Sequence, residues 1–530
     1  MMEIKDLSGK WYLNEEYGCW CLEDVPYTDV PGALPVQSLN IFVPKDYMSE
    51  GGVINADAAI NGYTPETVPV IFENNSAGYM EMPNVKLGEG RCYAAPYLNQ
   101  GYVYISCGNR GSGSVDADGV FCGKAPANLV DEKTAIRFLR HNRGAFPGNL
   151  DRIISVGWSA GGAMSTLIGV SGNNERFDEY LRANGAYMDE SDSVFASQIY
   201  CPIVDLDHAN LAYEWAFGKD PECMDSPAGP AEVMNEFKRA LSEKLTAGYI
   251  KYFNSLELLS VEKKIPLRFN EDGRSGSAYD YIMFKLNESA TEFLGKLSRG
   301  EAGEGYGVDE YLSGNYTYPV VKLQKLSQEE FEEAVARGEK LLRPMRRTMI
   351  DVQGDEKKGW LKWDGSKAEI SGLDTYILNH YRRMKPCPSF DLLGNNSGEN
   401  SVFGDKDRPF KHFDKDTLED LKELEADFPE ECRCISEFEK DLADEKLKEM
   451  IYLYNPLTYI GTEEKCDAAE HYRICVGSRD ADTSLFISLA LACRLGQYHS
   501  DVTHKIIWDR PHSEADYEGD VIRWIEGIVK

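Results

Sequence analysis

The sequence has 530 residues, a hydrophobic fraction of 42% and a formal net charge of −31. This length exceeds what one hydrophobic core normally accommodates, so we expect a large core with a second unit. The acidic excess argues against nucleic-acid binding, which requires a basic surface, and against docking on anionic membranes. No secretory signal and no apolar stretch long enough to span a bilayer are found, which predicts a cytoplasmic protein.

The 13 cysteines are an odd number and are scattered along the chain. We interpret them as reduced, mostly buried thiols. Two Cys-x-Cys pairs occur, Cys19/Cys21 and Cys432/Cys434. Zinc sites usually use a wider spacing between cysteines, so these pairs predict no metal site. We expect neither a metal ion nor another cofactor.

Strand and helix signals alternate over the first 205 residues. Apolar runs predict strands at residues 38–43, 68–72, 101–106 and 152–156. Asp131 to Asn142 has the pattern of an amphipathic helix with an acidic first turn. The alternation resumes at residues 194–203, 472–477, 484–494 and 502–508. This pattern predicts an α/β-hydrolase fold, in which helices flank a mostly parallel sheet.

The region between about Asp207 and Pro429 has a different character, with charged helical runs and Gly-rich turns. Because sheet-like strands resume after it, we interpret residues 207–430 as an inserted lid domain, with the core formed by residues 1–206 and 431–530. An independent domain on linkers is the alternative. Within this region the acidic run DKDRPFKHFDKD lacks the spacing of a calcium loop, and we interpret it as a solvated turn.

A Gly-x-Ser-x-Gly motif indicates a nucleophile. The stretch RIISVGWSAGGAMS places Ser159 directly after a predicted strand and before a small-residue helix start. A nucleophile elbow requires this strand–turn–helix setting, because its serine sits on a sharp turn above the sheet. Gly157, Gly161 and Gly162 remove side chains that would collide with the neighbouring strand and helix. The sequence therefore favours a nucleophilic Ser159 over an ordinary structural serine.

A serine nucleophile needs a base and a group that orients the base. In this architecture the order along the chain is Ser, then Asp or Glu, then His. Of the 8 histidines, His512 alone lies in the loop beyond the last predicted strand, and we predict that it is the base. Asp480 and Asp482 compete for the orienting role, and we favour Asp480 because it lies closer to the strand end. Asp482 is a candidate N-cap for a helix starting at Thr483.

An oxyanion hole needs two backbone N–H groups aimed at the developing charge. The residue after the nucleophile, Ala160, is expected to supply the first. The loop after an early strand should supply the second, and NNSAGYM follows the predicted strand VPVIF. Small residues keep the backbone of this loop accessible, so Ala77 or Gly78 is the expected donor.

Long stretches of the chain resemble the bacterial tannases (tannin acyl hydrolases) and related esterases of the α/β-hydrolase superfamily. The matching stretches occur in both parts of the core and include QSLNIFVP, NNSAGYM, GYVYISCGNRG, GKAPANLVDEKTAIRFLRHN, RIISVGWSAGGAMS, FASQIYCPIVDLDHANLAYEW, GSRDADTSL and PHSEADYEGDVIRWI. The resemblance implies a Ser159–Asp480–His512 triad and a lid domain. One departure is Trp158, a bulky residue where the elbow of the family is expected to have a small or polar one.

The resemblance also implies how the acyl group is held. Tannases of this type bind the galloyl hydroxyls with a lysine, a glutamate and the second aspartate of the Asp-x-Asp pair, which correspond to Lys385, Glu399 and Asp482. The alternative for Lys385 and Glu399 is a surface pair in a loop. Carboxylates accept hydrogen bonds from phenolic hydroxyls, and an ammonium group donates hydrogen bonds to the phenolic oxygens. These three side chains therefore suit a hydroxylated ring.

We therefore expect a serine esterase that acts on galloyl or protocatechuoyl esters through an acyl-enzyme. The alternative is a feruloyl esterase or a general carboxylesterase with another acyl specificity. A catalytically inactive hydrolase fold used as a binding module is a further alternative, although all three triad residues are present. The expected partner is a small aromatic ester, with no nucleic acid and no membrane, and the sequence does not predict the oligomeric state.

Overall fold

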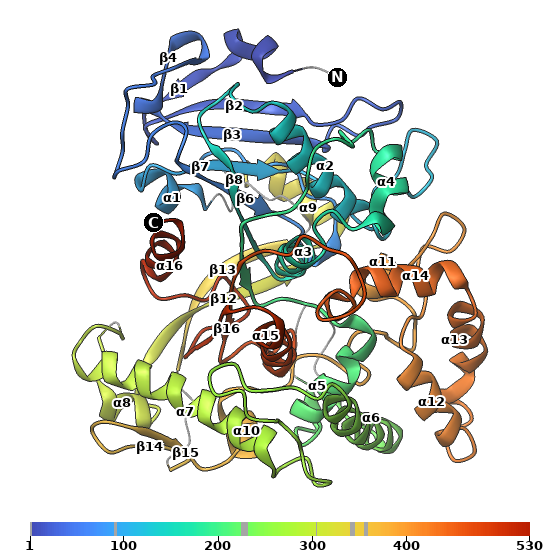
Figure 1. Cartoon of the computed structure of the whole chain (residues 1–530). Coiled ribbons are helices and arrows are strands. Elements are labelled where there is room, and N and C mark those ends of the chain that lie inside the picture. Colours follow the sequence, from blue (N-terminus) through green and yellow to red (C-terminus); the bar gives the residue numbers. More distant parts are fainter. Residues whose placement is uncertain (1–2, 89–92, 224–231, 304, 340–344, 354–358) are drawn as a thin grey trace.

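A nine-stranded sheet with the strand order β1-β2-β3-β7-β6-β8-β9-β16-β17 forms the centre of the protein (Figure 1). The computed structural model describes residues 3–88, 93–223, 232–303, 305–339, 345–353 and 359–530. The first strands pair antiparallel with one another and with β7, whereas β7, β6, β8, β9, β16 and β17 run parallel. This topology confirms the predicted α/β-hydrolase fold with its mostly parallel sheet.

The strands of this sheet are mostly short, apolar and buried, as expected where helices cover both faces. Their bounds are β1 (Tyr12–Asn14), β2 (Cys19–Pro26), β3 (Ser38–Pro44), β6 (Pro69–Asn74), β7 (Val103–Cys107), β8 (Asn149–Trp158), β9 (Ala196–Tyr200), β16 (His471–Gly477) and β17 (Asp501–Ile507). Strands β4 (Met48–Ser49) and β5 (Val53–Ile54) form a separate small hairpin. All strands predicted for the core are present, while β1 and β2 were not predicted.

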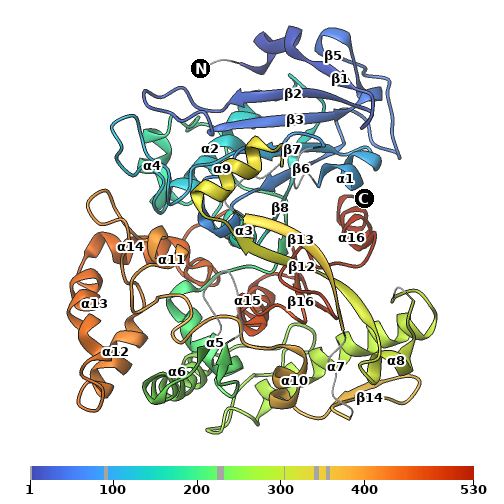
Figure 2. The same ribbon diagram turned by 180° about the vertical axis from the view of Figure 1, so that it is seen from behind.

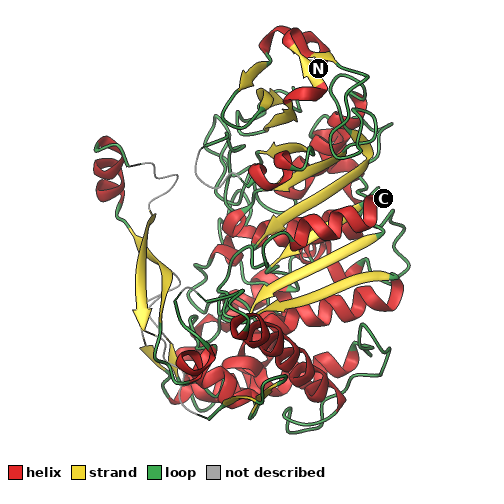
Figure 3. Ribbon diagram, turned by 90° about the vertical axis from the view of Figure 1, so that its left-hand side faces the viewer, coloured by secondary structure: helices red, strands yellow, loops and turns green. Residues whose placement is uncertain are grey.

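Helices pack on both faces of the sheet (Figures 1 and 3). One face carries α2 (Ala127–His141), α3 (Ala160–Val170) and α15 (Leu485–Tyr498), and α4 (Asp178–Ala183) packs against α2. The other carries α1 (Ala94–Asn99) and the last helix, α16 (Asp520–Val529). None of the helices in the described part of the chain combines the length and apolar character needed to cross a bilayer.

The chain leaves the sheet after Tyr200 and returns to it at His471, and most of the described residues between lie in the lower half of the molecule in Figure 1. The helices there are α5 (Ala209–Phe217), α6 (Glu236–Ser255), α7 (Ser277–Ser298), α8 (Val308–Leu312), α9 (Gln328–Ala336), α10 (Leu373–His380), α11 (Gly398–Val402), α12 (Lys415–Leu424), α13 (Ile435–Leu442) and α14 (Glu445–Tyr454). The strands are β10 (Glu222–Cys223), β11 (Glu232–Val233), β12 (Thr317–Lys325), β13 (Met345–Gln353), β14 (Leu361–Trp363) and β15 (Ala368–Ile370), which pair as hairpins.

The hairpin of β12 and β13 stands away from the rest of the protein with α9 at its tip, as Figure 3 shows. From behind, in Figure 2, the same hairpin crosses in front of the sheet. By contrast, α10 packs on the loop that follows β16. The hydroxyl of Tyr381 donates to the carbonyl of Thr483 at 2.8 Å, and Nε2 of His380 lies 2.9 Å from Oγ of Ser478. The inserted residues therefore cover the carboxyl end of β16, next to the edge of the sheet.

Helix α2 begins earlier than its charge pattern predicts. Asp131 and Glu132 are not first-turn acids but lie in the second turn, where both side chains are buried. Asp131 pairs with Arg110, whose Nη2 lies 2.7 Å from its Oδ1. The prediction of an acidic helix start was wrong because these carboxyl groups bind partners inside the fold and do not complement the helix dipole.

The acidic run DKDRPFKHFDKD is a solvated turn only in its first half. Lys411, His412 and Asp414 are buried within it. Nδ1 of His412 lies 2.6 Å from Oδ1 of Asp391, and Oδ1 of Asp414 accepts the backbone N–H of Thr417, which caps α12. The charged groups of this second half bind partners inside the fold, whereas Lys406 and Asp407 in the first half are exposed. The expectation of a solvated turn was therefore wrong for the second half of the run only.

No disulfide bond links the cysteines of the described residues, and most of them are buried. In the Cys19/Cys21 pair, both side chains lie in the core with their sulfur atoms 3.8 Å apart.

Candidate active site

Ser159 occupies the turn between β8 and α3 with a positive φ of 60°. This conformation is uncommon for a residue with a side chain and is typical of a strained functional turn. A Cβ atom on Gly157 would lie 2.2 Å from the carbonyl oxygen of Gly161, and one on Gly161 would lie 2.3 Å from that of Asn74. Only glycine fits at these positions, so the flanking glycines are required by the close approach of strand, turn and helix.

His512 lies between an aspartate and Ser159. Its Nδ1 is 2.9 Å from Oδ2 of Asp480, and its Nε2 is 2.8 Å from Oγ of Ser159. The loops after β8, β16 and β17 supply these residues, so strand ends far apart in the chain bring them together. The other carboxylate oxygen of Asp480 accepts the backbone N–H of Asp482 at 3.1 Å. Asp480 is fully buried, and these contacts fix its orientation.

The environment of His512 favours its protonated form. Burial alone lowers the pKa of an imidazole, but the Asp480 carboxylate outweighs burial and holds the pKa of His512 well above its usual range. In the neutral form of His512 the same contact holds Nδ1 as the donor, and only this form leaves Nε2 able to accept the proton of Ser159.

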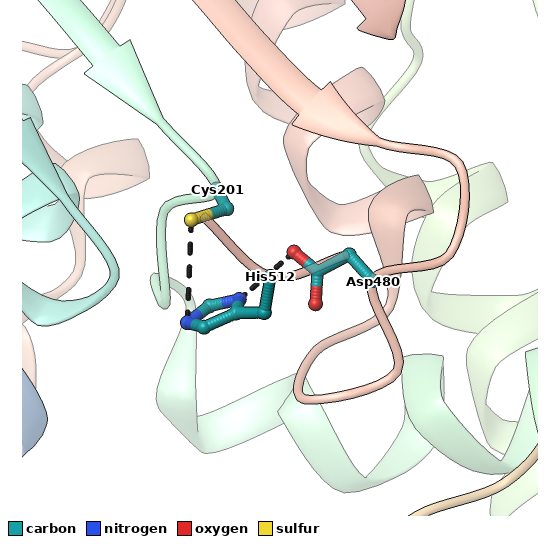
Figure 4. Close-up of side chains that lie close together, drawn as sticks. All are labelled: Cys201, Asp480 and His512. Carbon is teal, nitrogen blue, oxygen red and sulfur yellow. Dashed lines mark hydrogen bonds and ion pairs between the residues drawn. The ribbon is translucent and has the colours of Figure 1, made fainter. Parts of the chain in front are cut away.

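Two further side chains contact this histidine. The ring centroid of Trp158 lies 5.9 Å from that of His512. On another side, Sγ of Cys201 lies 4.0 Å from Nε2, as Figure 4 shows, and donates to the carbonyl of Ser513 at 3.2 Å. The sequence pattern did not single out Cys201, because a lone cysteine after a strand carries no signal of its own.

Two groups of side chains among the described residues have the composition of a metal-binding site. One is Cys201, Asp480 and His512, in which both imidazole nitrogens already face the aspartate and Ser159. The other is Asp205, Asp207 and His208. There the carboxylates are used internally: Asp205 accepts hydrogen bonds from Tyr252 at 2.7 Å and from Asn455 at 2.8 Å.

The loop after β6 lies against the start of α3, where both expected oxyanion donors would meet. Ala160 is the first residue of α3, and the backbone N–H of Ser76 would lie 3.4 Å from a Cβ on Gly161. Ala77 and Gly78 lie in a short 3-10 turn, Ala77–Tyr79, with Gly78 at a φ of 61°. The N–H groups of Ala77 and Gly78 are therefore both candidate donors.

Lys385 and Glu399 face each other beside this loop. Nζ of Lys385 is 3.6 Å from Oε1 of Glu399 and 3.8 Å from the ring centroid of Phe390. Their side chains are only 10% and 14% exposed, unlike those of a surface pair. A Cβ on Gly398, next to Glu399, would lie 3.7 Å from the carbonyl oxygen of Gly78. The pair therefore lies close to the candidate oxyanion loop.

Tyr213 connects this pair to the loop after β16. Its hydroxyl donates to the carbonyl of Ala481 at 2.9 Å and accepts the backbone N–H groups of Met384 and Lys385 at 3.1 and 3.0 Å. Asp482 follows Ala481 directly, and its backbone, not its side chain, takes part in the turn. Helix α15 begins at Leu485 with Ser484 at its N-cap, so Asp482 does not cap it. Sequence reasoning missed Tyr213, which has the pattern of an ordinary core aromatic residue.

The comparisons with known proteins agree with the fold described above. Residues 66–210 match the family model BD-FAE, an α/β-hydrolase family. The native structure of tannin acyl hydrolase from Lactobacillus plantarum is 30% identical with a TM-score of 0.75, covering 97% of this chain and 94% of that one. The chain belongs to the tannase family. The predicted resemblance is confirmed, and as a member of this family the protein is a carboxylic ester hydrolase.

Further tannase structures resemble the chain over a similar length. The tannase of Fusobacterium nucleatum is 27% identical with a TM-score of 0.73, covering 97% of this chain and 95% of that one. A tannin acyl hydrolase structure in complex with ethyl gallate is 30% identical with a TM-score of 0.75, covering 97% and 94% of the two chains. No significant match occurs among curated protein sequences.

Proposed function

We propose that the protein is a serine esterase that hydrolyses esters of hydroxylated aromatic acids, galloyl or protocatechuoyl, through an acyl-enzyme. The observation that carries this proposal is the position of His512 within hydrogen-bond distance of both Asp480 and Ser159. A serine hydroxyl is a weak nucleophile unless a base accepts its proton in the transition state. This arrangement supplies the base and fixes its tautomer.

In the first half-reaction, Oγ of Ser159 attacks the ester carbonyl carbon while Nε2 of His512 takes the hydroxyl proton. The tetrahedral intermediate collapses, the bond to the alcohol oxygen breaks, and His512 returns the proton to the leaving alcohol. Water then attacks the acyl-enzyme with His512 again as base, and the acid is released. Asp480 stays ionised and stabilises the imidazolium in both halves.

The developing oxyanion is held by backbone N–H groups. The N–H of Ala160 and that of Ala77 or Gly78 are the proposed donors, supported by the packing of the 3-10 turn near the start of α3.

The acyl ring is bound by Lys385, Glu399 and Asp482. The low exposure of the Lys385–Glu399 pair and the Tyr213 bridge to the Asp482 loop support this assignment. Relatives support the acyl class, because tannin acyl hydrolase structures are described as complexes with 3,4-dihydroxybenzoate and with ethyl gallate. Residues 207–430 contribute Lys385, Glu399 and Tyr213, and we assign them the role of a lid over the site.

The test compares the wild-type protein with Ser159→Ala. The variant is expected to lose hydrolysis of methyl gallate and of simple aryl esters while its thermal unfolding stays unchanged. A fluorophosphonate probe should label the wild-type protein and not the variant. Hydrolysis near the wild-type rate in the variant would exclude the serine mechanism, and no labelling of the wild type would favour an inactive binding module.

The acyl specificity has its own test, because a feruloyl esterase or a general carboxylesterase could share the triad. Values of kcat/KM are measured with methyl gallate, methyl ferulate and 4-nitrophenyl acetate. Preference for methyl gallate is expected, and Lys385→Ala should remove that preference while hydrolysis of 4-nitrophenyl acetate persists. Unchanged gallate selectivity in Lys385→Ala would mean that the hydroxyl-binding assignment is wrong.

A further inference from the structure

A fully buried acid, Glu132, contacts the candidate oxyanion loop, and no step of the proposed hydrolysis uses it. Its side chain belongs to the second turn of α2. Oε1 of Glu132 accepts a hydrogen bond from Oγ of Ser76 at 3.4 Å. Ser76 directly precedes the 3-10 turn Ala77–Tyr79, which carries both candidates for the second oxyanion donor. The carboxyl group therefore binds this loop from its buried side.

The same hydroxyl of Ser76 is bound by a second buried side chain, that of Asn109 in the loop after β7. Nδ2 of Asn109 donates to Oγ of Ser76 at 3.0 Å. The backbone N–H of Asn109 donates to the carbonyl of Met82 at 3.0 Å, and the N–H of Met82 donates to the carbonyl of Asn109 at 3.2 Å. Asn109 thus holds both ends of the loop, and Glu132 joins it at Ser76.

Two oxygen atoms of this network lack a partner. Oε2 of Glu132 and Oδ1 of Asn109 are buried, and neither makes a hydrogen bond with the described residues. An ionised carboxylate and an amide oxygen are both acceptors, so neither satisfies the other. A proton on Glu132 converts one of the two acceptors into a donor and leaves no charge buried in the network. The geometry therefore favours an uncharged carboxyl group.

The surroundings of Glu132 also favour the proton. Burial raises the pKa of its carboxyl group well above the ordinary value, against the opposing effect of the Ser76 hydrogen bond, and the Asp131 carboxylate raises the pKa further. Arg110 does not compensate for this, because its guanidinium binds Asp131 at 2.7 Å. The other described ionisable side chains that interact with Glu132 carry no positive charge, and they are Tyr27, Cys107 and Tyr454.

The loop also lies tightly against the nucleophile helix. A Cβ on Gly161 would lie 2.3 Å from the carbonyl oxygen of Asn74 and 3.4 Å from the backbone nitrogen of Ser76. The loop therefore has no room to move closer to α3. Oxyanion donors act at about 2.7–3.1 Å from the oxyanion, so a small displacement of Ser76 would misplace the N–H groups that follow it.

We infer that Glu132 is a positioning residue, which fixes Ser76 through its carboxyl group and so aims the N–H groups of Ala77 and Gly78 at the oxyanion. The inference rests on the proposed ester hydrolysis and adds a residue that supports its oxyanion hole. Burial of a carboxyl group with an unpartnered oxygen lowers stability, whereas burial of a leucine side chain does not. A contribution to stability therefore does not account for an acid at this position.

The test compares two substitutions of Glu132 in the hydrolysis of methyl gallate. Glu132→Gln keeps an uncharged group of the same shape with a donor and an acceptor, and its kcat should stay within about threefold of wild type. Glu132→Leu removes the hydrogen bond to Ser76. Its kcat should fall by at least about tenfold, towards the 10²–10³-fold loss known for a deleted oxyanion donor, with KM little changed.

A matched control and two further readouts separate positioning from general damage. Thr134→Val removes another buried hydrogen-bonding group of α2, whose hydroxyl donates to the carbonyl of Val130 at 2.7 Å, and should keep the wild-type kcat. In Glu132→Leu, the rate of fluorophosphonate labelling should fall in parallel with kcat. The acid limb of the kcat/KM profile, which reports His512, should stay at the wild-type pH. Thermal unfolding checks that each variant is folded.

Ser76→Ala tests the same contact from the loop side, and it keeps the inference testable if Glu132→Leu does not fold. It should lower kcat to a similar extent, and the double variant should lose little more than either single variant. Wild-type kcat in Glu132→Leu or in Ser76→Ala would overturn the inference, as would a Glu132→Gln variant as impaired as Glu132→Leu. If the wild-type protein does not hydrolyse methyl gallate at all, the proposed function itself fails.

Discussion

The protonation state of His512 sets the pH range in which the proposed hydrolysis can operate. The imidazole must be neutral to accept the Ser159 proton, and the Asp480 carboxylate raises its pKa well above the usual range. The acid limb of the kcat/KM profile for methyl gallate is therefore expected above pH 6.5, the ordinary value.

Asp480→Asn provides the test of this coupling. Removal of the negative charge should move the acid limb to lower pH and reduce kcat by about 10³–10⁴-fold, because the imidazole loses its fixed tautomer. The measurement is a pH–rate profile of both proteins with methyl gallate. An acid limb at the same pH in the variant would contradict the proposed role of Asp480.

Glu73 makes a second prediction at the level of one residue. Its pKa of about 7 lies above the unfolded value of 4.5, so its ionisation opposes folding as the pH rises. This loss of stability from ionising Glu73 is absent below the unfolded pKa of 4.5 and is fully present above pH 7. The free energy of unfolding of Glu73→Gln minus that of the wild type should therefore be about 2–3 kcal/mol larger at pH 8 than at pH 5.

Urea unfolding of both proteins at the two pH values measures this difference. Glu16→Gln, at an exposed position, is the control and should show no comparable pH dependence. A Glu73→Gln effect that is equal at both pH values would mean that the carboxyl group titrates in its ordinary range in the folded protein.

Among the structural elements, the segment after α10 depends on one buried ion pair. Arg383 and Glu214 of α5 are both fully buried and form a bidentate pair, with Nη1 2.9 Å from Oε2. Nε of Arg383 also donates to the carbonyl of Lys385 at 2.8 Å. Arg383→Met leaves the Glu214 charge buried without this partner and should reduce the free energy of unfolding by about 3–5 kcal/mol.

Chemical denaturation checks the stability loss, and the substrate panel checks its functional consequence. Because Lys385 loses a backbone contact, the preference for methyl gallate over 4-nitrophenyl acetate should fall as well. Arg299→Met, which removes an exposed pair with Glu301, is the control and should leave the stability close to that of the wild type, because exposed ion pairs contribute little. A double variant with Glu214→Leu should recover part of the stability, and a double variant as unstable as Arg383→Met would contradict the buried-charge explanation.

The elements that the sequence predicted well are those with a local signal. Strands such as VPVIF are continuous apolar runs, and the positions of Asp480 and His512 follow from the order of strands along the chain. Strand β2 was not predicted because it carries Glu23 and Asp24 at a bulge between Leu22 and Val25, which breaks the alternation. The start of α2 was misplaced because buried and first-turn carboxylates have the same sequence pattern.

At the scale of the whole molecule, the contacts that local patterns cannot predict are those between the insertion and the core. Tyr213 contacts Ala481 across 268 positions of the chain, and Lys124 contacts Ser401 across 277. Neither residue differs locally from an ordinary core tyrosine or a surface lysine. The proximity of Lys385 and Glu399 to the triad loops therefore followed from a family resemblance and not from spacing.

The net charge gives a prediction for the entire chain. Asp and Glu number 88 against 57 Lys and Arg, so even complete pairing leaves an excess of −31 that repels itself in the folded state. Salt shortens the range of this repulsion from about 30 Å at 0.01 M to about 8 Å at 0.15 M. Screening also weakens exposed ion pairs, but each of these pairs contributes only about 0–1 kcal/mol to stability.

We therefore expect the excess charge to dominate, and the midpoint of thermal unfolding at pH 7 should rise by about 1–3 °C between low salt and about 0.15 M NaCl. The measurement is differential scanning calorimetry across a NaCl series. At pH 5 carboxylates begin to take up protons and the net negative charge falls, so the same series should give a smaller rise. A midpoint that falls with salt at pH 7 would mean that attractive ion pairs, such as those of the insertion, outweigh the global repulsion.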